Sequence, residues 1–177
     1  MPTPPDISRM QLKPIKVTFL EMHEKPEKIA LKDETHFKIL EKPINVDDYR
    51  HLYYSVGEKY FWLDRMVMED EKLSGLINAD NIDIIAMYIN GDVAGYAEFK
   101  KEEKFTEIIY FGLMPAFIGK GLGKYFLDWA IQHAWTYNPE WVRLDTCELD
   151  HPHALSNYKK RGFKEVRTEI QDRKVII

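Results

Sequence analysis

Three glycines within five residues, Gly119, Gly121 and Gly123, stand between a predicted strand and a predicted helix. Without Cβ atoms, such a loop lets its backbone approach a ligand closely. The first amides of the helix have no partner within it, and the helix dipole adds positive potential there. Phosphate or pyrophosphate is the ligand that this arrangement favours. The alternative is a tight strand-to-helix turn whose glycines serve packing alone.

The spacing of the glycines excludes the two best-known phosphate loops. No Gly-Lys-Ser or Gly-Lys-Thr follows a four-residue spacer, as a Walker A loop requires. The Gly-x-Gly-x-Gly pattern also differs from the dinucleotide fingerprint Gly-x-Gly-x-x-Gly. A phosphate site here would therefore belong to another kind of loop.

A second motif follows along the chain. Tyr158 stands 35 residues beyond Gly123 on a predicted helix, which Gly162 ends just before Phe163. Together with the run Phe111-Gly112-Leu113-Met114-Pro115 before the loop, this arrangement resembles the GNAT superfamily of acyl-CoA-dependent N-acetyltransferases. GNAT proteins carry Gln/Arg-x-x-Gly-x-Gly/Ala between a strand and a helix, and later a helix bearing a tyrosine followed by Gly-Phe.

The resemblance extends over about residues 45–166, and the runs 110–115 and 146–152 look like a bacterial subgroup of the family. It implies acetyl-CoA as a co-substrate and no metal. The positions that it assigns to CoA are Phe111, Gly112, Leu113, Ile118, Gly119, Lys120, Gly121, Leu122, Gly123, Lys124 and Asn157.

The resemblance also implies a β-bulge through which the amides of Phe111 and Leu113 bind the pantetheine arm and the acetyl group. Gly112 suits such a bulge, although it could instead relieve crowding. Ile118 departs from the family, which has Gln or Arg there. Since backbone amides do most of the binding, we expect weaker CoA binding rather than none. Lys120 and Lys124 either supply compensating charge or lie on a solvated helix surface.

Acyl transfer to an amine needs a base for the amine, stabilisation of the thioester oxyanion and an acid for the leaving thiolate. Glu107 stands six residues before Leu113, the spacing of the general base in the histone-acetylating branch of the family. An exposed residue paired with a lysine is the alternative. Glu98, on the neighbouring predicted strand, competes with it for the role of base or lies beside the substrate. Tyr158 occupies the position of the family's acid.

The acceptor pocket of the family lies under the first two helices, where this chain has Tyr60, Trp62 and Arg65. An aromatic wall with an arginine suits a small acceptor that carries a carboxylate or phosphate, although core aromatics beside a surface arginine are the alternative. Cys147 lies mid-strand and is expected to be a small buried side chain rather than a nucleophile. His151 and His153 flank a helix start, and no metal site is expected from them.

Hydrophobic periodicity predicts the elements that must position these residues. Helices are expected over 46–56, 70–77, 121–135 and 152–160, and strands over 17–22, 36–40, 82–89, 93–99, 106–113, 141–149, 163–170 and 174–177. Asn90-Gly91 predicts a tight hairpin. This order indicates an α+β or α/β three-layer fold of the GNAT kind, with helices on both faces of a mixed, mostly antiparallel sheet of six to seven strands. Residues 1–15 are expected to be a loose lead-in to a single N-acetyltransferase domain over 16–177.

Composition narrows the function class further. The 177 residues are 45% hydrophobic and carry a net charge of −4, which argues against a disordered chain, a nucleic-acid binder or a polybasic membrane binder. No apolar run approaches the ~20 residues of a membrane span, and one cysteine permits no internal disulfide. We therefore expect a cytoplasmic protein whose partner is a small-molecule or peptide amine, with a homodimer left open.

Two functions from different classes fit the sequence. The first is an N-acetyltransferase that moves an acetyl group from acetyl-CoA to a primary amine by direct attack. The second is a non-catalytic module of the same fold that binds acyl-CoA as a sensor or interaction domain. Ile118 slightly favours the second function, whereas Glu107 and Tyr158 together favour the first.

Overall fold

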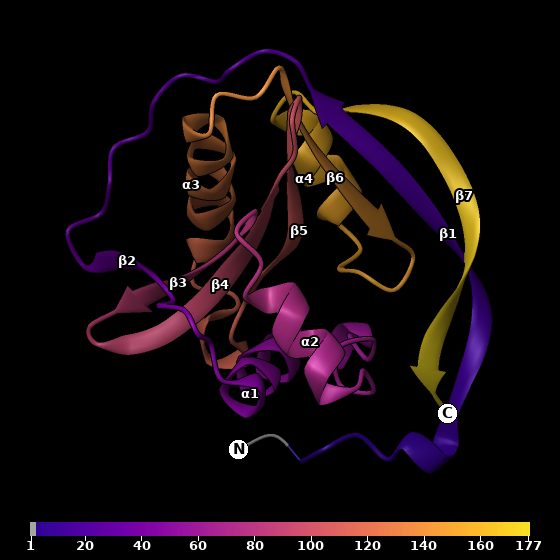
Figure 1. Cartoon of the computed structure of the whole chain (residues 1–177). Coiled ribbons are helices and arrows are strands. Elements are labelled where there is room, and N and C mark those ends of the chain that lie inside the picture. Colours follow the sequence, from indigo (N-terminus) through magenta and orange to yellow (C-terminus); the bar gives the residue numbers. More distant parts are fainter. Residues whose placement is uncertain (1–2) are drawn as a thin grey trace.

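A computed structural model describes residues 3–177. Seven strands form one sheet in the order β2-β3-β4-β5-β6-β1-β7 (Figure 1). The strands are β1 (Met10–Met22), β2 (Thr35–Ile39), β3 (Ile82–Ile89), β4 (Asp92–Lys101), β5 (Phe105–Leu113), β6 (Trp141–Cys147) and β7 (Lys164–Ile176). The helices are α1 (Val46–Gly57), α2 (Asp70–Ile77), α3 (Leu122–Thr136) and α4 (Ala154–Lys160).

The sheet confirms the expected mixed, mostly antiparallel architecture. Every neighbouring pair runs antiparallel except β5 and β6, which are parallel. The hairpin at Asn90-Gly91 joins β3 to β4, and both residues have the positive φ that its turn requires. The first strand, β1, lies between β6 and the last strand, β7, at one end of the sheet (Figure 1).

The helices cover both faces, as expected. Tyr49 and Tyr53 of α1 pack with Leu73 of α2 against one face of the sheet. Phe126 and Ala130 of α3 belong to a second core on the opposite face. Asn45 begins α1 by accepting hydrogen bonds from the amides of the first turn, as its sequence position predicts.

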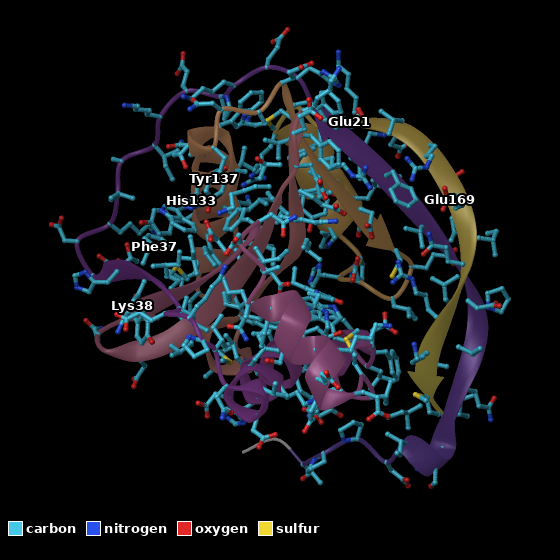
Figure 2. All side chains as sticks on the ribbon, in the orientation of Figure 1. Glu21, Phe37, Lys38, His133, Tyr137 and Glu169 are labelled. Carbon is cyan, nitrogen blue, oxygen red and sulfur yellow. The ribbon has the colours of Figure 1, made fainter. Side chains whose placement is uncertain are left out.

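The far end of α3 rests on β2 through aromatic stacking. The ring centres of Phe37 and Trp129 lie 3.8 Å apart, and His133 also stacks on Trp129. His133 Nε2 lies 2.9 Å from the hydroxyl of Tyr137 (both labelled in Figure 2). This packing fixes α3, and therefore the glycine loop at its start, against the sheet.

Two sequence expectations about the ends of the chain need correction. Residues 10–15, expected in a loose lead-in, form the first half of β1. The two closing strands expected over 163–170 and 174–177 are one strand, β7. Both differences have the same physical reason. Strands β1 and β7 pair antiparallel along nearly their whole length, and each supplies backbone hydrogen-bond partners for the other. Local patterning does not reveal such a pairing between the two ends of a chain.

Strands β5 and β6 separate soon after they pair, and we call this separation the splay. Their parallel pairing ends at Glu107 and Arg143, although β5 continues to Leu113. The register of β4 and β5 shifts at the same place, where Ile109 is an extra residue between Ile108 and Tyr110. A bulge bends its strand. The expected bulge is therefore present in this strand, but at Ile109 rather than at Gly112.

Candidate active site

One cavity of about 580 Å³ opens at the splay. This volume lies within the range of about 300–1,000 Å³ usual for small-ligand sites. It reaches from the glycine loop, along β5 and β6, to the loop between α1 and α2. Its wall includes twelve of the residues expected from the sequence, namely Tyr60, Trp62, Phe111, Gly112, Leu113, Ile118, Gly119, Gly121, Gly123, Lys124, Asn157 and Tyr158.

The open edge of β5 offers unpaired amides to this cavity. The amide of Met114 donates to the carbonyl of Ala94, so Gly112 and Tyr110 are the next hydrogen-bonded positions toward β4. Since these positions alternate, the amides of Phe111 and Leu113 face the other edge. No strand pairs with that edge beyond Glu107 among residues 3–177. Gly112 itself permits close helix packing, because a Cβ there would lie 2.5 Å from a methyl group of Val56.

The glycine loop has the geometry of an anion cradle. Gly119 and Gly121 have φ values of +81° and +74°, and Gly121 directly precedes α3. Within the described part of the chain, no backbone hydrogen bond outside the helices and strands starts from the amides of Gly119, Lys120 or Gly121. With the free amides of the first turn of α3, this loop can bind phosphate.

Two residues of the loop lie outside the wall of the cavity. Leu122 packs in the core, and the Lys120 ammonium lies 5.2 Å from the ring centre of Phe117. Ile118 is 41% exposed at the rim. Lys124 lines the cavity, so it is the better placed of the two lysines to supply charge.

Tyr158 of α4 lines the cavity from the face of the sheet that α3 covers. Burial, with the charges of Asp150 and Asp145, raises its pKa above the usual tyrosine value, so the hydroxyl stays protonated and can act as an acid. Arg161, which the sequence left unassigned, holds α4 to α3. Its Nε lies 2.6 Å from a carboxylate oxygen of Asp128, and its Nη2 donates to the carbonyl of Lys124.

The opposite side of the cavity carries charge. We call Asp64, Asp145, Asp150, Arg173 and Lys174 the charged wall; all five line the cavity. Lys174 Nζ lies 2.5 Å from Asp64, and Arg173 lies 3.9 Å from both Asp64 and Asp145. Sequence reasoning missed these residues. Burial alternates along β6, so Asp145 lies on the face opposite the core side chains, and nothing local indicated that β7 reaches the cavity.

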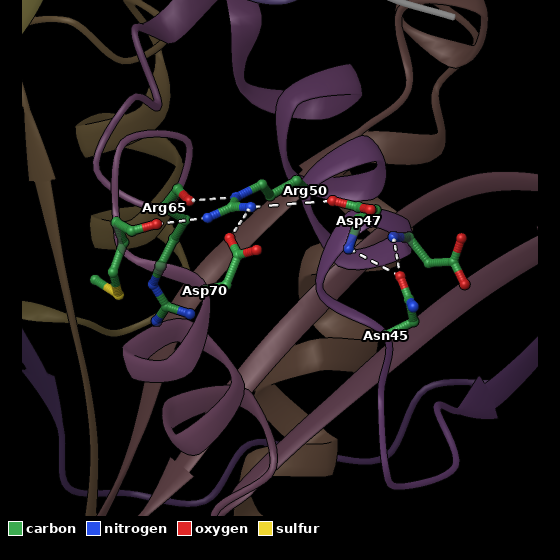
Figure 3. Close-up of polar contacts among 7 residues, drawn as sticks. Asn45, Asp47, Arg50, Arg65 and Asp70 are labelled. Carbon is green, nitrogen blue, oxygen red and sulfur yellow. Dashed lines mark hydrogen bonds and ion pairs between the residues drawn. The ribbon is translucent and has the colours of Figure 1, made fainter.

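The loop between α1 and α2 is fixed by Arg50 (Figure 3). Its Nε donates to the carbonyl of Arg65 over 3.2 Å, and its Nη1 lies 2.6 Å from the Asp70 carboxylate. Trp62 and Asp64, which line the cavity, belong to this loop. The loop that carries the aromatic part of the expected pocket is therefore held in place by the Arg50 side chain of α1.

Arg65 and Glu98 do not line the cavity, and this corrects their expected contact with a substrate. Arg65 Nη2 donates to Glu98 over 3.0 Å, and the Tyr49 hydroxyl donates to the same carboxylate over 2.6 Å. Arg65 is 5% exposed and Glu98 is fully buried. The two form an internal ion pair beneath the wall, with the guanidinium 5.2 Å from the ring centre of Tyr110.

Glu107 lies at the base of the splay, outside the wall of the cavity. Burial raises the pKa of its carboxyl, and Arg143, whose Nε lies 3.9 Å away, opposes that shift. Its assignment as the base stays a prediction. Cys147 does line the cavity, but burial and Asp150 raise the pKa of its thiol, which keeps it protonated and disfavours nucleophilic attack.

Comparisons with known proteins agree with this geometry. The sequence model of the acetyltransferase (GNAT) family matches residues 40–163. No curated protein matches the sequence significantly. Among solved structures, a conserved protein of unknown function from Staphylococcus epidermidis is 19% identical, with a TM-score of 0.54 over 93% of this chain. This chain covers 60% of that protein's length.

Two further solved structures share the fold. A protein from Novosphingobium aromaticivorans assigned to the GNAT family is 15% identical, with a TM-score of 0.62 over 99% of this chain and 70% of its own. An aminoglycoside acetyltransferase from an uncultured soil metagenomic sample is 16% identical, with a TM-score of 0.56 over 73% of this chain and 88% of its own. The family match spans more than half of the sequence. The splay, the glycine loop and the tyrosine helix lie within the matched residues and line one cavity. The chain belongs to the GNAT family of acetyltransferases.

Proposed function

We propose that the protein moves an acetyl group from acetyl-CoA to a primary amine by direct attack. The observation that carries this proposal is that one continuous cavity runs from the glycine loop through the splay to the charged wall. A cofactor entering at the loop and an amine entering at the charged wall would meet at the splay. Such a meeting supplies the proximity and orientation that a direct transfer needs.

The chain's own groups have separate tasks in this reaction. The loop amides bind the pyrophosphate, and the open edge of β5 binds the pantetheine arm. The amides of Phe111 or Leu113 donate to the thioester oxygen and stabilise the oxyanion as it forms. Tyr158 then gives its proton to the departing thiolate of CoA. The remaining task, removal of the amine proton, falls to a carboxylate near the splay.

The charged wall supports a small polar acceptor. Its carboxylates suit an ammonium group, while Arg173 and Lys174 suit a neighbouring anionic or hydroxyl group. Trp62 and Tyr60 add apolar surface. The relation to an aminoglycoside acetyltransferase makes amino sugars worth testing beside amino acids, polyamines and peptide N-termini. We propose no nucleic-acid or membrane partner, and a homodimer stays open. None of the helices in residues 3–177 is long and apolar enough to cross a membrane; a cytoplasmic location is part of the proposal.

Release of free CoA thiol from acetyl-CoA in the presence of pooled amines tests this function. We expect Tyr158→Phe to lower turnover by about 10–10²-fold, because the thiolate then leaves without its acid. The loss should shrink as pH rises, since a free thiolate becomes a tolerable leaving group. Calorimetry should give an unchanged acetyl-CoA affinity. A Tyr158→Phe enzyme with full activity at every pH would remove this tyrosine from the mechanism.

The second candidate is an acyl-CoA sensor without turnover. One observation favours it, because Ile118 at the rim replaces the polar side chain usual in the family. The same assay separates the two functions. Measurable acetyl-CoA binding with no thiol release above background, for any amine tested, would support the sensor.

A further inference from the structure

Asp145 differs from the other carboxylates of the charged wall in its hydrogen bonds. Asp64 accepts from Lys174, and Asp150 accepts from the Thr146 hydroxyl and the amide of Cys147. No side-chain hydrogen bond within residues 3–177 ends at the Asp145 carboxylate, although its backbone pairs with β1. Its nearest cation is Arg173 Nη2, 3.9 Å away. The Asp145 carboxylate therefore lines the cavity with its acceptor capacity unused.

The strand geometry places this carboxylate beside the splay. Val142 and Leu144 pack in the core on the α3 face, so Asp145 lies on the opposite face, the one covered by α1 and α2. It stands two residues beyond Arg143, the last position of β6 that pairs with β5. Arg173, which neighbours Asp145, also neighbours Asp64 in the loop between α1 and α2. Asp145 thus lies where the charged wall meets the open edge of β5.

Charged and titratable groups face Asp145 from several elements. They are Arg143 and Asp150 on its own strand and the following turn, Glu107 on β5, Arg167 and Arg173 on β7, and Tyr158 on α4. Burial raises the pKa of the Asp145 carboxyl, Asp150 raises it further, and Arg173 lowers it. The net rise makes Asp145 a stronger base than an exposed aspartate.

Tyr158 approaches the splay from the α3 face and Asp145 from the α1–α2 face. Both residues line the same cavity, and the charge of Asp145 contributes to the raised pKa of Tyr158. A base and an acid on opposite sides of the splay is the arrangement that amine attack and thiolate departure require. Glu107, in contrast, belongs to the last residue pair that joins β5 to β6 and does not line the cavity.

We propose that Asp145 removes the proton from the acceptor amine, the role that sequence resemblance gave to Glu107. The proposal rests on the proposed acetyltransferase function. The acceptor ammonium gives one proton to Asp145, and the neutral nitrogen attacks the thioester carbon. The C–N bond forms, the C–S bond breaks, and the thiolate takes the Tyr158 proton. The second proton lost by the nitrogen restores Tyr158, and Asp145 releases its proton to water.

The test compares Asp145→Asn with Glu107→Gln, using acetyl-CoA and a panel of lysine, spermidine, glycylglycine and sisomicin. Asp145→Asn should lower kcat/KM about 10²–10⁴-fold at pH 7. The loss should shrink as pH rises toward about 10, because the amine is then already neutral. Wild-type kcat/KM should fall as the pH drops through the raised pKa of Asp145, and Asp145→Asn should lack that limb. The decrease in kcat/KM caused by Glu107→Gln should be at least tenfold smaller than the decrease caused by Asp145→Asn.

Controls separate the possible outcomes. Asp92→Asn, at the exposed β3–β4 hairpin, should match wild type. Asp145→Glu restores a carboxylate and should recover part of the rate, and equal Tm and acetyl-CoA affinity would show that the variants fold. Wild-type activity in Asp145→Asn, or a deep loss in Glu107→Gln alone, would overturn the assignment of Asp145 only. Absence of turnover by the wild type with every amine would overturn the proposed function and this role with it.

Discussion

Replacing Gly121 with glutamate is expected to abolish acetyl-CoA binding while the protein still folds. The residue lies in the cradle just before α3 with φ of +74°, and a Cβ there would meet no heavy atom within 4 Å. The carboxylate would face the pyrophosphate where free amides should bind it. We expect an affinity loss of at least about 100-fold, which is about 2.7 kcal/mol. Calorimetric titration with acetyl-CoA measures it.

Two variants control for effects other than charge. Gly121→Ala imposes the same left-handed strain, of about 1–2 kcal/mol, on a neutral side chain and should keep most of the affinity. Gly75→Glu adds the same charge to α2, where a Cβ also meets nothing within 4 Å. Unchanged affinity in Gly121→Glu would show that the loop does not hold the pyrophosphate.

Arg65→Ala should cost about 3–5 kcal/mol in free energy of unfolding, because it leaves the Glu98 carboxylate buried without its cation. The Tyr49 hydroxyl would remain as a donor to that carboxylate, but it carries no charge. The removed guanidinium also packs against the Tyr110 ring, so the loss should extend to the wall of the cavity. Urea unfolding followed by fluorescence measures the change.

The exposed ion pair of Lys159 and Glu165 provides the comparison. With side chains about half exposed, Lys159→Ala should cost no more than about 1 kcal/mol. The double variant Arg65→Met/Glu98→Leu should recover much of the stability lost in Arg65→Ala, since no buried charge is left unpaired. A loss below 1 kcal/mol in Arg65→Ala would mean that the pair does not stabilise the fold.

Local chemistry was enough to predict most of the elements. The Asn90-Gly91 turn and the left-handed glycines before α3 need conformations that few residues adopt, and Asn45 begins α1 because its short side chain accepts hydrogen bonds from the first-turn amides. Local chemistry was also enough to find the two motifs that line the candidate site, the glycine loop and the tyrosine helix. Gly119, Gly121, Gly123 and Tyr158 line the cavity, and the short-range geometry of the loop and of the helix is encoded by residues close to them in sequence.

Residues whose roles depend on distant contacts were not predicted from their type. The Arg65 and Glu98 side chains look like site residues in a sequence, yet they neutralise each other inside the protein. Only the packing of the loop between α1 and α2 against β4 decides this, because an ionised side chain is buried when a partner 33 residues away satisfies it.

The charged wall shows most clearly which features the sequence predicts and which only the tertiary structure reveals. Asp145 was visible as a charged residue on an alternating strand, but the splay that exposes it depends on where β5 and β6 stop pairing. Arg173 and Lys174 reach the cavity because β7 pairs with β1, which in turn pairs with β6. The sequence by itself determined the family, and it predicted that the glycine loop and Tyr158 belong to one site. The tertiary structure decided which carboxylates face an acceptor, because strand pairing between distant segments sets which side chains share a cavity.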